Sequence, residues 1–303
     1  MSHSGQGVEQ HPVQAIGLML LAVFLLATMD VAIKQLVAHY PSMQVVLLRC
    51  ALSLPLLSAW MLARDQRLFR TRFLKAHLAR GAVGLLMLFA IGECLRELQL
   101  ADAYAIFFAA PLLLTLLSGP VMREPAGAVR TGAAVLGFTG VLVVLKPGAV
   151  AWISYGSMMA LLAVVCYAVI VLLVRALGRQ EESLTIAFWF TALVGLGSAP
   201  FAWAVWLPLQ SRHWPWFVVL GVTGTLGQVL LTAAFRRASA AVVAPYDYTH
   251  MVWAVLYGWL VWGHLPATTT WLGAGIITAS GLFILYREHR LRRRQAAAAG
   301  LGH

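Results

Sequence analysis

The stretch AIGLMLLAVFLLATMDVAIKQLV, residues 15–37, decides the fold of this chain. An α-helix rises about 1.5 Å per residue, so an apolar run of this length crosses a hydrocarbon core of about 30 Å. The run is continuously apolar rather than alternating, and lipid offers no partner for an unpaired backbone amide. We therefore predict a transmembrane helix here.

Similar apolar runs follow one another almost without pause along the chain. The ten runs cover approximately residues 15–37, 43–62, 76–97, 101–121, 129–146, 153–176, 184–206, 214–235, 241–262 and 268–287. Hydrophobic residues make up 61% of the 303 positions and charged residues 11%, whereas soluble proteins average about half and about a quarter. The sequence predicts an all-α integral membrane protein with ten transmembrane helices.

The net charge of +11 follows the membrane topology. If the N-terminus is cytoplasmic, the cytoplasmic segments hold Arg64, Arg67, Arg70, Arg72, Lys75, Arg80, Arg123, Arg130, Arg175, Arg179, Arg236, Arg237, Arg287, Arg290, Arg292, Arg293 and Arg294. These are 17 of the 22 Lys and Arg residues, as the positive-inside rule requires. The basic charge needs no nucleic-acid partner to explain it. An even number of spans places both termini in the cytoplasm, and we expect a multi-pass protein of the cell inner membrane.

The first span is long, it is followed by further spans, and the fourteen residues before it contain no Lys or Arg, so we expect no cleaved signal peptide. The three cysteines, Cys50, Cys94 and Cys166, lie within apolar runs and lack the close pairing that a metal or redox site needs. We interpret them as small packing residues.

The two halves of the chain show a loose internal repeat. Gly132 and Gly140 of the fifth span have the same spacing as Gly273 and Gly281 of the tenth. Five spans per half would bring the second copy into the membrane from the opposite face, so the repeat would be inverted. Chance matches are the alternative, because Gly is frequent in membrane helices. The predicted repeats are residues 1–150 and residues 151–303, the second with a basic cytoplasmic tail, within one membrane domain.

Several short motifs occur along the chain in a characteristic order. They are Pro41 with Arg49, Leu100–Ile106 leading to Pro111-Leu112, Arg123-Glu124, Gly137–Leu142 leading to Lys146-Pro147-Gly148, Ala238-Ser239-Ala240 leading to Pro245-Tyr246, Gly263-His264-Leu265-Pro266, and Gly281-Leu282. In their order and spacing the chain resembles the ten-helix EamA-type branch of the drug/metabolite transporter superfamily over nearly its whole length. His264 stands where this family often has Glu, so a role for that acid does not carry over.

The resemblance implies two inverted five-helix repeats around a central cavity, which moves metabolites such as amino acids. Within the family the chain is most similar to aromatic amino-acid exporters. The resemblance also implies alternating access to the cavity from the two sides of the membrane.

Ionisable groups inside the spans indicate polar sites, because a charge in hydrocarbon costs at least about 2.5–3.5 kcal/mol. Asp30 and Lys34 are four residues apart on one helix, so they can pair with each other. Arg49 enters the second span from the same side, and Glu93 is the deepest acid near the end of the third span. These four residues are either structural ion pairs or parts of an outer gate or docking point for a zwitterionic substrate.

The ninth span contains a helix breaker, an acid and an imidazole within one apolar segment. Pro245 lacks a backbone donor and should kink the helix. Asp247 and His250 are three residues apart and could cooperate, whereas not all polar groups between Tyr246 and His250 can face one cavity. The segment is either a binding site or a polar cap whose acid is neutralised by the arginines at positions 236 and 237.

We place the predicted substrate site between the two halves. Its residues are Tyr104, Phe108, Tyr167, Gln228, Tyr246, Asp247, His250 and Trp253, with helix kinks at Pro111 and Pro245. Rings on one side would hold an apolar side chain, while Gln228 and freed carbonyls would meet an amino or carboxyl group. Gln228 has a structural alternative, since an amide among glycines is commonly packing glue.

No sequence motif indicates catalysis. The chain has no HExxH, no Cys/His ligand spacing, no phosphate-cradling loop and no nucleophile elbow. We therefore expect no enzyme activity, no cofactor and no metal. A facilitator or secondary transporter exporting neutral or aromatic amino acids is the favoured function. Export of organic cations, drugs or another metabolite is the alternative, and a non-transporting scaffold or receptor is the weaker one. The sequence fits a monomer and a homodimer equally.

Overall fold

The computed structural model describes residues 12–114, 128–145, 154–177, 181–237 and 240–300, and within them the chain is helical with short connections. The long helices are α1 (Pro12–Val37), α2 (Ser42–Arg64), α3 (Leu74–Glu97), α6 (Ala128–Leu145), α7 (Tyr155–Leu177), α8 (Ser183–Ala204), α9 (Trp214–Arg237) and α12 (Thr268–Gly300). The shorter ones are α4 (Leu100–Phe107), α10 (Ala240–Val243), α11 (His250–Trp262) and the 3₁₀ turns η1 (Gln66–Phe69), η2 (Ser211–His213) and η3 (Ala244–Thr249).

Seven of the described helices are long and apolar enough to cross a membrane: residues 13–37, 42–64, 74–97, 155–173, 184–204, 211–234 and 268–287. The all-α membrane fold is thereby confirmed. Residues 100–114 and 131–145 form shorter apolar helices, and α11 has 13 residues. The count of ten full spans stays a prediction, because the fourth, fifth and ninth segments are described over shorter lengths.

The fourth and ninth segments are interrupted close to their prolines. α4 ends at Phe107, a turn covers residues 108 and 109, and helix resumes at residue 110, immediately before Pro111. Pro245 lies at the start of η3, six residues of tighter 3₁₀ helix that precede α11. Proline supplies no backbone N–H and clashes with the preceding turn, which accounts for irregular hydrogen bonding at both places.

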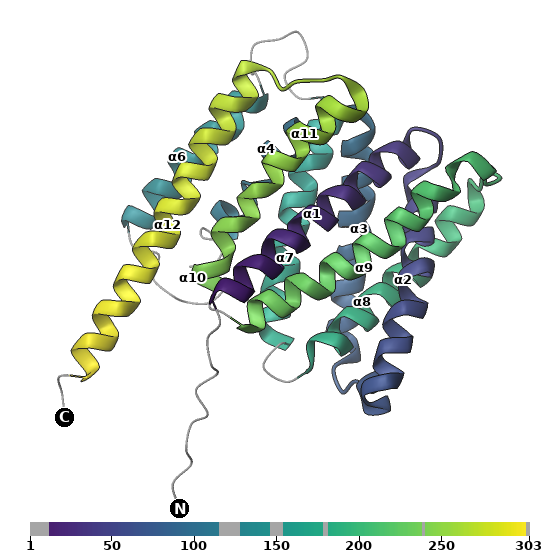
Figure 1. The fold of residues 1–303 in the computed structure, drawn as a ribbon, viewed down its shortest axis with the longest axis horizontal. Helices are drawn as coiled ribbons and strands as arrows, with labels where there is room; N and C mark the ends of the chain where they lie inside the picture. Colours follow the sequence, from purple (N-terminus) through teal and green to yellow (C-terminus); the bar gives the residue numbers. More distant parts are fainter. Residues whose placement is uncertain (1–11, 115–127, 146–153, 178–180, 238–239, 301–303) are drawn as a thin grey trace, which may run out of the picture.

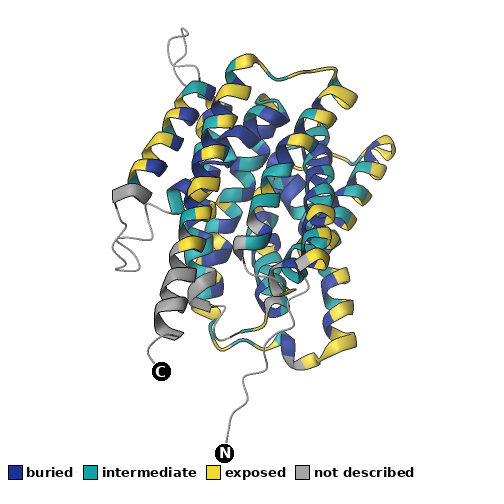
Figure 2. Cartoon of the chain, turned by 60° about the vertical axis from the view of Figure 1, so that its left-hand side comes forward, coloured by how far each residue is buried: buried dark blue, intermediate teal, exposed yellow. Residues whose placement is uncertain are grey.

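The helices pack in pairs that join distant parts of the chain (Figure 1). α1 packs along α9, α2 along α8, α3 along α7, and α6 along α12. α4 and α11 also contact each other, and Figure 1 shows them between the α6–α12 pair and the other helices. Buried residues gather on the facing sides of the helices, while exposed residues lie on the outer sides (Figure 2). The outer sides carry large apolar groups such as Leu196 and Trp203, which suit a lipid environment.

Gly140 of α6 and Gly273 of α12 lie where these two helices come together. A Cβ on Gly140 would lie 2.7 Å from the carbonyl oxygen of Gly273. A Cβ on Gly281 would collide with the Tyr248 hydroxyl, whereas one on Gly132 would meet nothing within 4 Å. The backbones therefore approach closely at Gly140 and Gly273, as small residues permit in membrane helices.

Candidate functional site

A buried phenol joins the first and fourth segments in the interior. Tyr104 of α4 donates a hydrogen bond from its hydroxyl to the Asp30 carboxylate of α1. Tyr104 is buried, with 7% of its surface exposed. Asp30 also lies within coulombic range of Arg49 on α2 and of His250 on α11. An acid in the middle of an apolar helix is thus surrounded by a donor and two basic groups, which offsets its burial.

His250 extends this contact into the second half of the chain. Its ring stacks on the Tyr104 ring, with centroids 5.1 Å apart and 20° between the planes. Its Nδ1 lies 3.2 Å from a carboxylate oxygen of Asp247 and 3.0 Å from the Asp247 backbone oxygen. Asp30, Tyr104, His250 and Asp247 therefore form one continuous group, which we call the acid–imidazole cluster. The predicted cooperation of Asp247 with His250 corresponds to a direct contact.

Aromatic rings surround the Asp247 end of this cluster. The Asp247 side chain is 52% exposed, and it lies within coulombic range of Tyr167 on α7 and Tyr248 on η3. Phe108 packs edge-to-face on Tyr248 at 4.9 Å. Tyr167 is itself 46% exposed although it lies in the middle of α7. The Asp247 carboxylate and the Tyr167 ring are thus exposed close to each other, which suits recognition of an amino group or an aromatic side chain.

Tyr246 and Trp253 lie beside the cluster, against α1. Trp253 packs edge-to-face on Phe24 at 4.9 Å and lies 6.5 Å from the ring of Tyr257. Tyr246 and Trp253 both border a small core formed by α1, α9 and α10. These two predicted residues therefore contribute to the contact between the first and ninth segments.

The structure corrects the predicted pairing of Asp30 with Lys34. The structure shows no ion pair between them. Lys34 instead donates from Nζ to the carbonyl oxygens of Leu95 and Leu98, at 2.8 and 2.7 Å, and lies 5.6 Å from the Trp262 ring centroid. The spacing of four residues allowed an Asp30–Lys34 pair. The carbonyls at the C-terminal end of α3 have no acceptor role within the helix, however, and they attract the Lys34 ammonium group. Lys34 therefore holds the end of α3 against α1.

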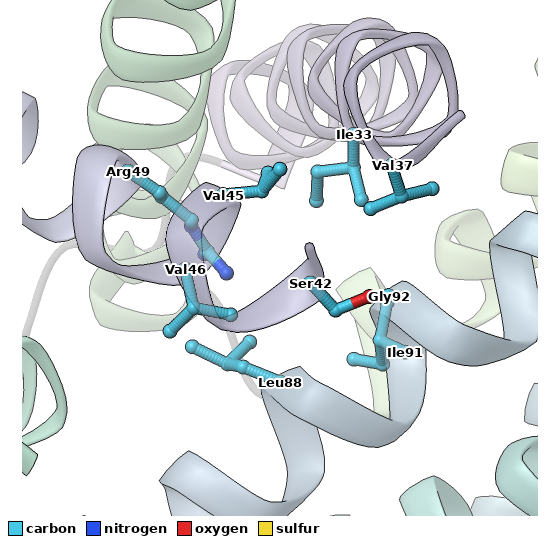
Figure 3. Close-up of a pocket in the computed structure, with 9 residues that line it drawn as sticks. All are labelled: Ile33, Val37, Ser42, Val45, Val46, Arg49, Leu88, Ile91 and Gly92. Atoms are coloured by element: carbon cyan, nitrogen blue, oxygen red, sulfur yellow. The ribbon is translucent and has the colours of Figure 1, made fainter. Parts of the chain in front are cut away.

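Arg49 borders a small pocket between α1, α2 and α3, of about 10 Å³, roughly the room for one water (Figure 3). Figure 3 shows the guanidinium reaching from α2 towards the space between Ile33, Val37 and Gly92. Within the described part of the chain the structure gives it no hydrogen-bond acceptor, and its charged neighbour is Asp30. Arg49 is thus a cation in the interior that remains able to bind an anion.

Glu93 belongs to a separate polar cluster at the end of α3. It accepts a hydrogen bond from Ser42 at 2.5 Å and pairs with Arg96 at 3.5 Å. Arg96 also donates to the backbone oxygen of Tyr40 at 3.1 Å. The neighbouring Glu97 accepts a hydrogen bond from the Gly156 amide at 2.6 Å, at the start of α7. This cluster joins the ends of α2, α3 and α7, so Glu93 has partners suited to a structural role.

Gln228 lies apart from the acid–imidazole cluster, in a second and larger pocket between α2, α8 and α9. We call this pocket, of about 460 Å³, the basic groove. It is lined by Leu57, Trp60, Arg64, Leu184, Ala187, Gln228, Val229, Thr232, Ala233 and Arg237. The structure therefore brings seven of the eight predicted substrate-site residues towards α1, α4, α7 and α11, and places Gln228 elsewhere.

Sequence reasoning missed a buried polar cluster where α3 meets α8. His77 is fully buried and contacts Glu181 at 2.6 Å, and Thr71 donates to the same carboxylate. Arg80, counted as a cytoplasmic loop charge, is buried and donates to the Ile186 carbonyl. Glu181 lies 104 positions from His77, and no local spacing signals the contact.

Some predicted motif residues lie outside the described residues. These are Arg123, Glu124, Lys146, Pro147, Gly148, Ala238 and Ser239. His264 follows Gly263, whose φ of 67° closes α11 through a left-handed cap. The His264 amide donates to the Gly258 carbonyl at 3.0 Å, so this motif acts here as a helix stop.

Comparison with known proteins identifies two matching regions. The family model described as the EamA-like transporter family matches residues 13–146 and again residues 154–286. Together the two matches cover most of the chain.

Individual relatives are transporters named for different substrates. The chain is 28% identical to the pseudopaline exporter of Pseudomonas aeruginosa over 264 residues, covering 87% of this chain and 93% of that protein. It is 28% identical to a riboflavin transporter of Vibrio cholerae, covering 95% and 98%. It is 27% identical to an S-adenosylmethionine uptake transporter of Rickettsia conorii, covering 92% and 95%.

A crystal structure supports the fold. It matches this chain with a TM-score of 0.63 at 18% identity, over 92% of this chain and 99% of the other. At this identity the likeness concerns the fold alone.

Proposed function

Because the chain belongs to the EamA-like transporter family, we propose that it is a secondary transporter or facilitator that exports a small zwitterionic metabolite. Small-molecule transport follows from the family and from relatives that cover nearly the whole chain. Among zwitterions we favour neutral amino acids, with aromatic ones first. Its relatives are named for pseudopaline, riboflavin and S-adenosylmethionine, so the choice of substrate rests on the chemistry of the site.

We propose that the chain consists of two inverted five-helix repeats, residues 1–150 and 151–303. The double match of the family model supports this division. The helix pairs also support it. In the two repeats α1 corresponds to α7 and α3 corresponds to α9, so exchanging the repeats turns the pair α1–α9 into the pair α7–α3. The same exchange leaves the pairs α2–α8, α4–α11 and α6–α12 unchanged. Both patterns are what a twofold axis between the repeats produces.

The acid–imidazole cluster carries the proposal of a transport site. Its four members come from α1, α4, η3 and α11, so it joins the two halves at the place where alternating access must rearrange contacts. Ionisable groups inside membrane segments are costly and mark substrate or ion pathways. A scaffold or receptor has no need to bear that cost in its interior.

The charges and rings around the cluster divide the recognition of a zwitterion between them. Asp247 and Asp30 are acids suited to an ammonium group, and Arg49 is the interior cation suited to a carboxylate. Tyr104, Phe108 and Tyr167 supply aromatic faces for the side chain. An aromatic amino acid uses all three kinds of contact.

Transport by purified protein in liposomes tests this proposal. A panel of labelled amino acids, organic cations and other metabolites is assayed with and without a proton gradient. We expect counterflow of a neutral or aromatic amino acid above that of empty liposomes. Absence of counterflow for every amino acid, together with transport of another metabolite, would refute the substrate class while leaving the family assignment intact.

An organic cation is the competing substrate, and Asp247 separates the two. A cation has no carboxylate for Arg49, so it depends on the acids alone. We expect Asp247→Asn to abolish transport of an organic cation but to reduce amino-acid transport by only about tenfold to a hundredfold, because a hydrogen bond to a charged group contributes about 1.5–3 kcal/mol and the contact of the substrate carboxylate with Arg49 remains. Folded yield by size exclusion controls for misfolding.

We further propose that the protein is a multi-pass protein of the cell inner membrane with both termini cytoplasmic. The distribution of Arg and Lys among the connections supports this orientation. The substrate and the lipid bilayer are its expected partners.

A further inference from the structure

The basic groove is a second site that the transport proposal does not use. It encloses about 460 Å³, within the range of about 300–1,000 Å³ typical of small-molecule pockets. It lies where the C-terminal ends of α2 and α9 and the N-terminal end of α8 meet. It is thus a site at one end of the helix bundle, distinct from the acid–imidazole cluster.

The groove is strongly positive. Arg64 at the end of α2 and Arg237 at the end of α9 both line it. Among the described residues, Arg237 donates to the Ala233 carbonyl of its own helix, at 3.3 Å, and to no other acceptor, and the structure shows no acceptor for Arg64. No acidic side chain occurs among the described lining residues. Two guanidinium groups without a carboxylate partner indicate an anion that offers several oxygens, such as a phosphate group.

The N-terminal end of α8 forms one wall of the groove. Leu184 and Ala187 of its first two turns line the groove. Glu182, at the N-cap, makes no side-chain capping hydrogen bond, so the first backbone amides of α8 have no side-chain cap from this residue. Glu181 is held by His77 and Thr71, on the side of α8 that meets α3.

The rest of the groove is amphipathic. Trp60 lines it with 40% of its surface exposed, and Val229 adds apolar surface beside it. Gln228 and Thr232 lie one helical turn apart on α9 and supply polar groups. A ligand that fits these walls has an anionic head, neighbouring hydrogen-bonding groups and an apolar body.

We propose that the basic groove binds the headgroup of an acidic phospholipid from the cytoplasmic leaflet, with Arg64 and Arg237 contacting the phosphate. The arginine-rich connections lie at this end of the bundle, which the positive-inside rule makes the cytoplasmic end. That leaflet carries anionic lipids, and basic pockets between transmembrane helices on this side bind such headgroups. Gln228 then serves lipid recognition, and the site is independent of the identity of the transported substrate.

Native mass spectrometry of the purified protein tests this proposal with phosphatidylglycerol and phosphatidylcholine at equal concentration. We expect wild-type protein to retain phosphatidylglycerol in preference to phosphatidylcholine. The double variant Arg64→Gln/Arg237→Gln should retain at least about tenfold less of it, since each charge-assisted contact to phosphate is stronger than a neutral hydrogen bond. Arg212→Gln, which removes an exposed arginine at the opposite end, is the matched control and should behave as wild type.

Three outcomes would overturn the proposal. They are equal retention of the two lipids by wild type, undiminished retention by the double variant, and displacement of the lipid by millimolar inorganic phosphate, which would identify a site for soluble anions. Transport of the substrate by the double variant in phosphatidylcholine liposomes is measured in parallel. Its persistence shows that loss of lipid binding leaves the transport proposal untouched, and thermal unfolding of each variant verifies that it is folded.

Discussion

Tyr104 is one of the residues that join the two halves of the chain. Its hydroxyl donates to Asp30 and its ring stacks on His250, so one side chain contacts an acid of the first half and an imidazole of the second. The ring and the hydroxyl have separate partners. A substitution can therefore remove one contact and keep the other.

Tyr104→Phe removes the hydroxyl and leaves the ring in place. Asp30 then loses the hydrogen bond from the Tyr104 hydroxyl in a buried environment, and a hydrogen bond to a charged group contributes about 1.5–3 kcal/mol. We expect the transport rate to fall by roughly tenfold or more while the folded yield stays near that of wild type. The rate is measured in liposomes with the substrate found in the panel. A variant with the normal rate would remove Tyr104 and Asp30 from the proposed site.

Glu181 has a structural role that a neighbouring residue allows us to isolate. It accepts hydrogen bonds from buried His77 and from Thr71, whereas the adjacent Glu182 is exposed. We expect Glu181→Ala to lower the free energy of unfolding by about 1–3 kcal/mol, because it leaves a buried imidazole without its partner. Glu182→Ala should change it little. The melting temperatures of the two variants in the same detergent measure the difference, and equal values would contradict the role of Glu181.

At the scale of elements, the close approach of α6 and α12 depends on glycine. A side chain at Gly140 would press on the Gly273 backbone, which cannot move aside like a flexible side chain. Gly132 lies on the same helix, two turns away, with open space around its Cβ position. The two positions therefore form a matched pair.

We expect Gly140→Leu to reduce the folded yield, since overpacking a close contact costs about 1–3 kcal/mol. Gly132→Leu should fold as well as wild type, and Gly281→Leu, which collides with Tyr248, should resemble Gly140→Leu. Fluorescence-detected size exclusion measures the monodisperse fraction of each variant. If Gly140→Leu folded normally but changed substrate selectivity, the packing role of this face would be wrong.

At the scale of the whole molecule, orientation in the membrane follows from charge. The ends of α2, α9 and α12 carry arginine, while residues 205–213 between α8 and α9 carry Arg212 as their one Lys or Arg. The cytoplasmic side retains Lys and Arg because their translocation is disfavoured. This predicts that Phe69 and the 290s face the cytoplasm and that Ser211 faces outward.

Single cysteines placed at positions 69, 290 and 211, in a background without Cys50, Cys94 and Cys166, test the orientation. We expect an impermeant thiol reagent added to intact cells to label position 211 and not the other two. Permeabilised cells, in which all three should react, provide the control. Labelling of position 69 or 290 in intact cells would reverse the proposed topology.

The sequence by itself determined that this is an all-helical membrane protein, where the apolar segments lie and that the cysteines are buried. It did so because hydropathy, helix rise and the distribution of arginine act over short stretches of chain. The interruptions near Pro111 and Pro245 belong to the same class, since the missing amide is a property of one residue. Asp247 with His250 was also within reach of sequence reasoning, because helix spacing brings residues three apart together.

Only the tertiary structure decided which polar groups meet across the bundle. Tyr104 reaches Asp30 across 74 positions and His77 reaches Glu181 across 104, and Lys34 prefers the carbonyls of α3 to the acid on its own helix. The packing of the helices also places Gln228 in the basic groove, with Arg64 and Trp60, rather than in the cluster around His250. The physical reason is that a buried polar side chain needs a partner, and which partner lies within about 3 Å depends on how the helices pack.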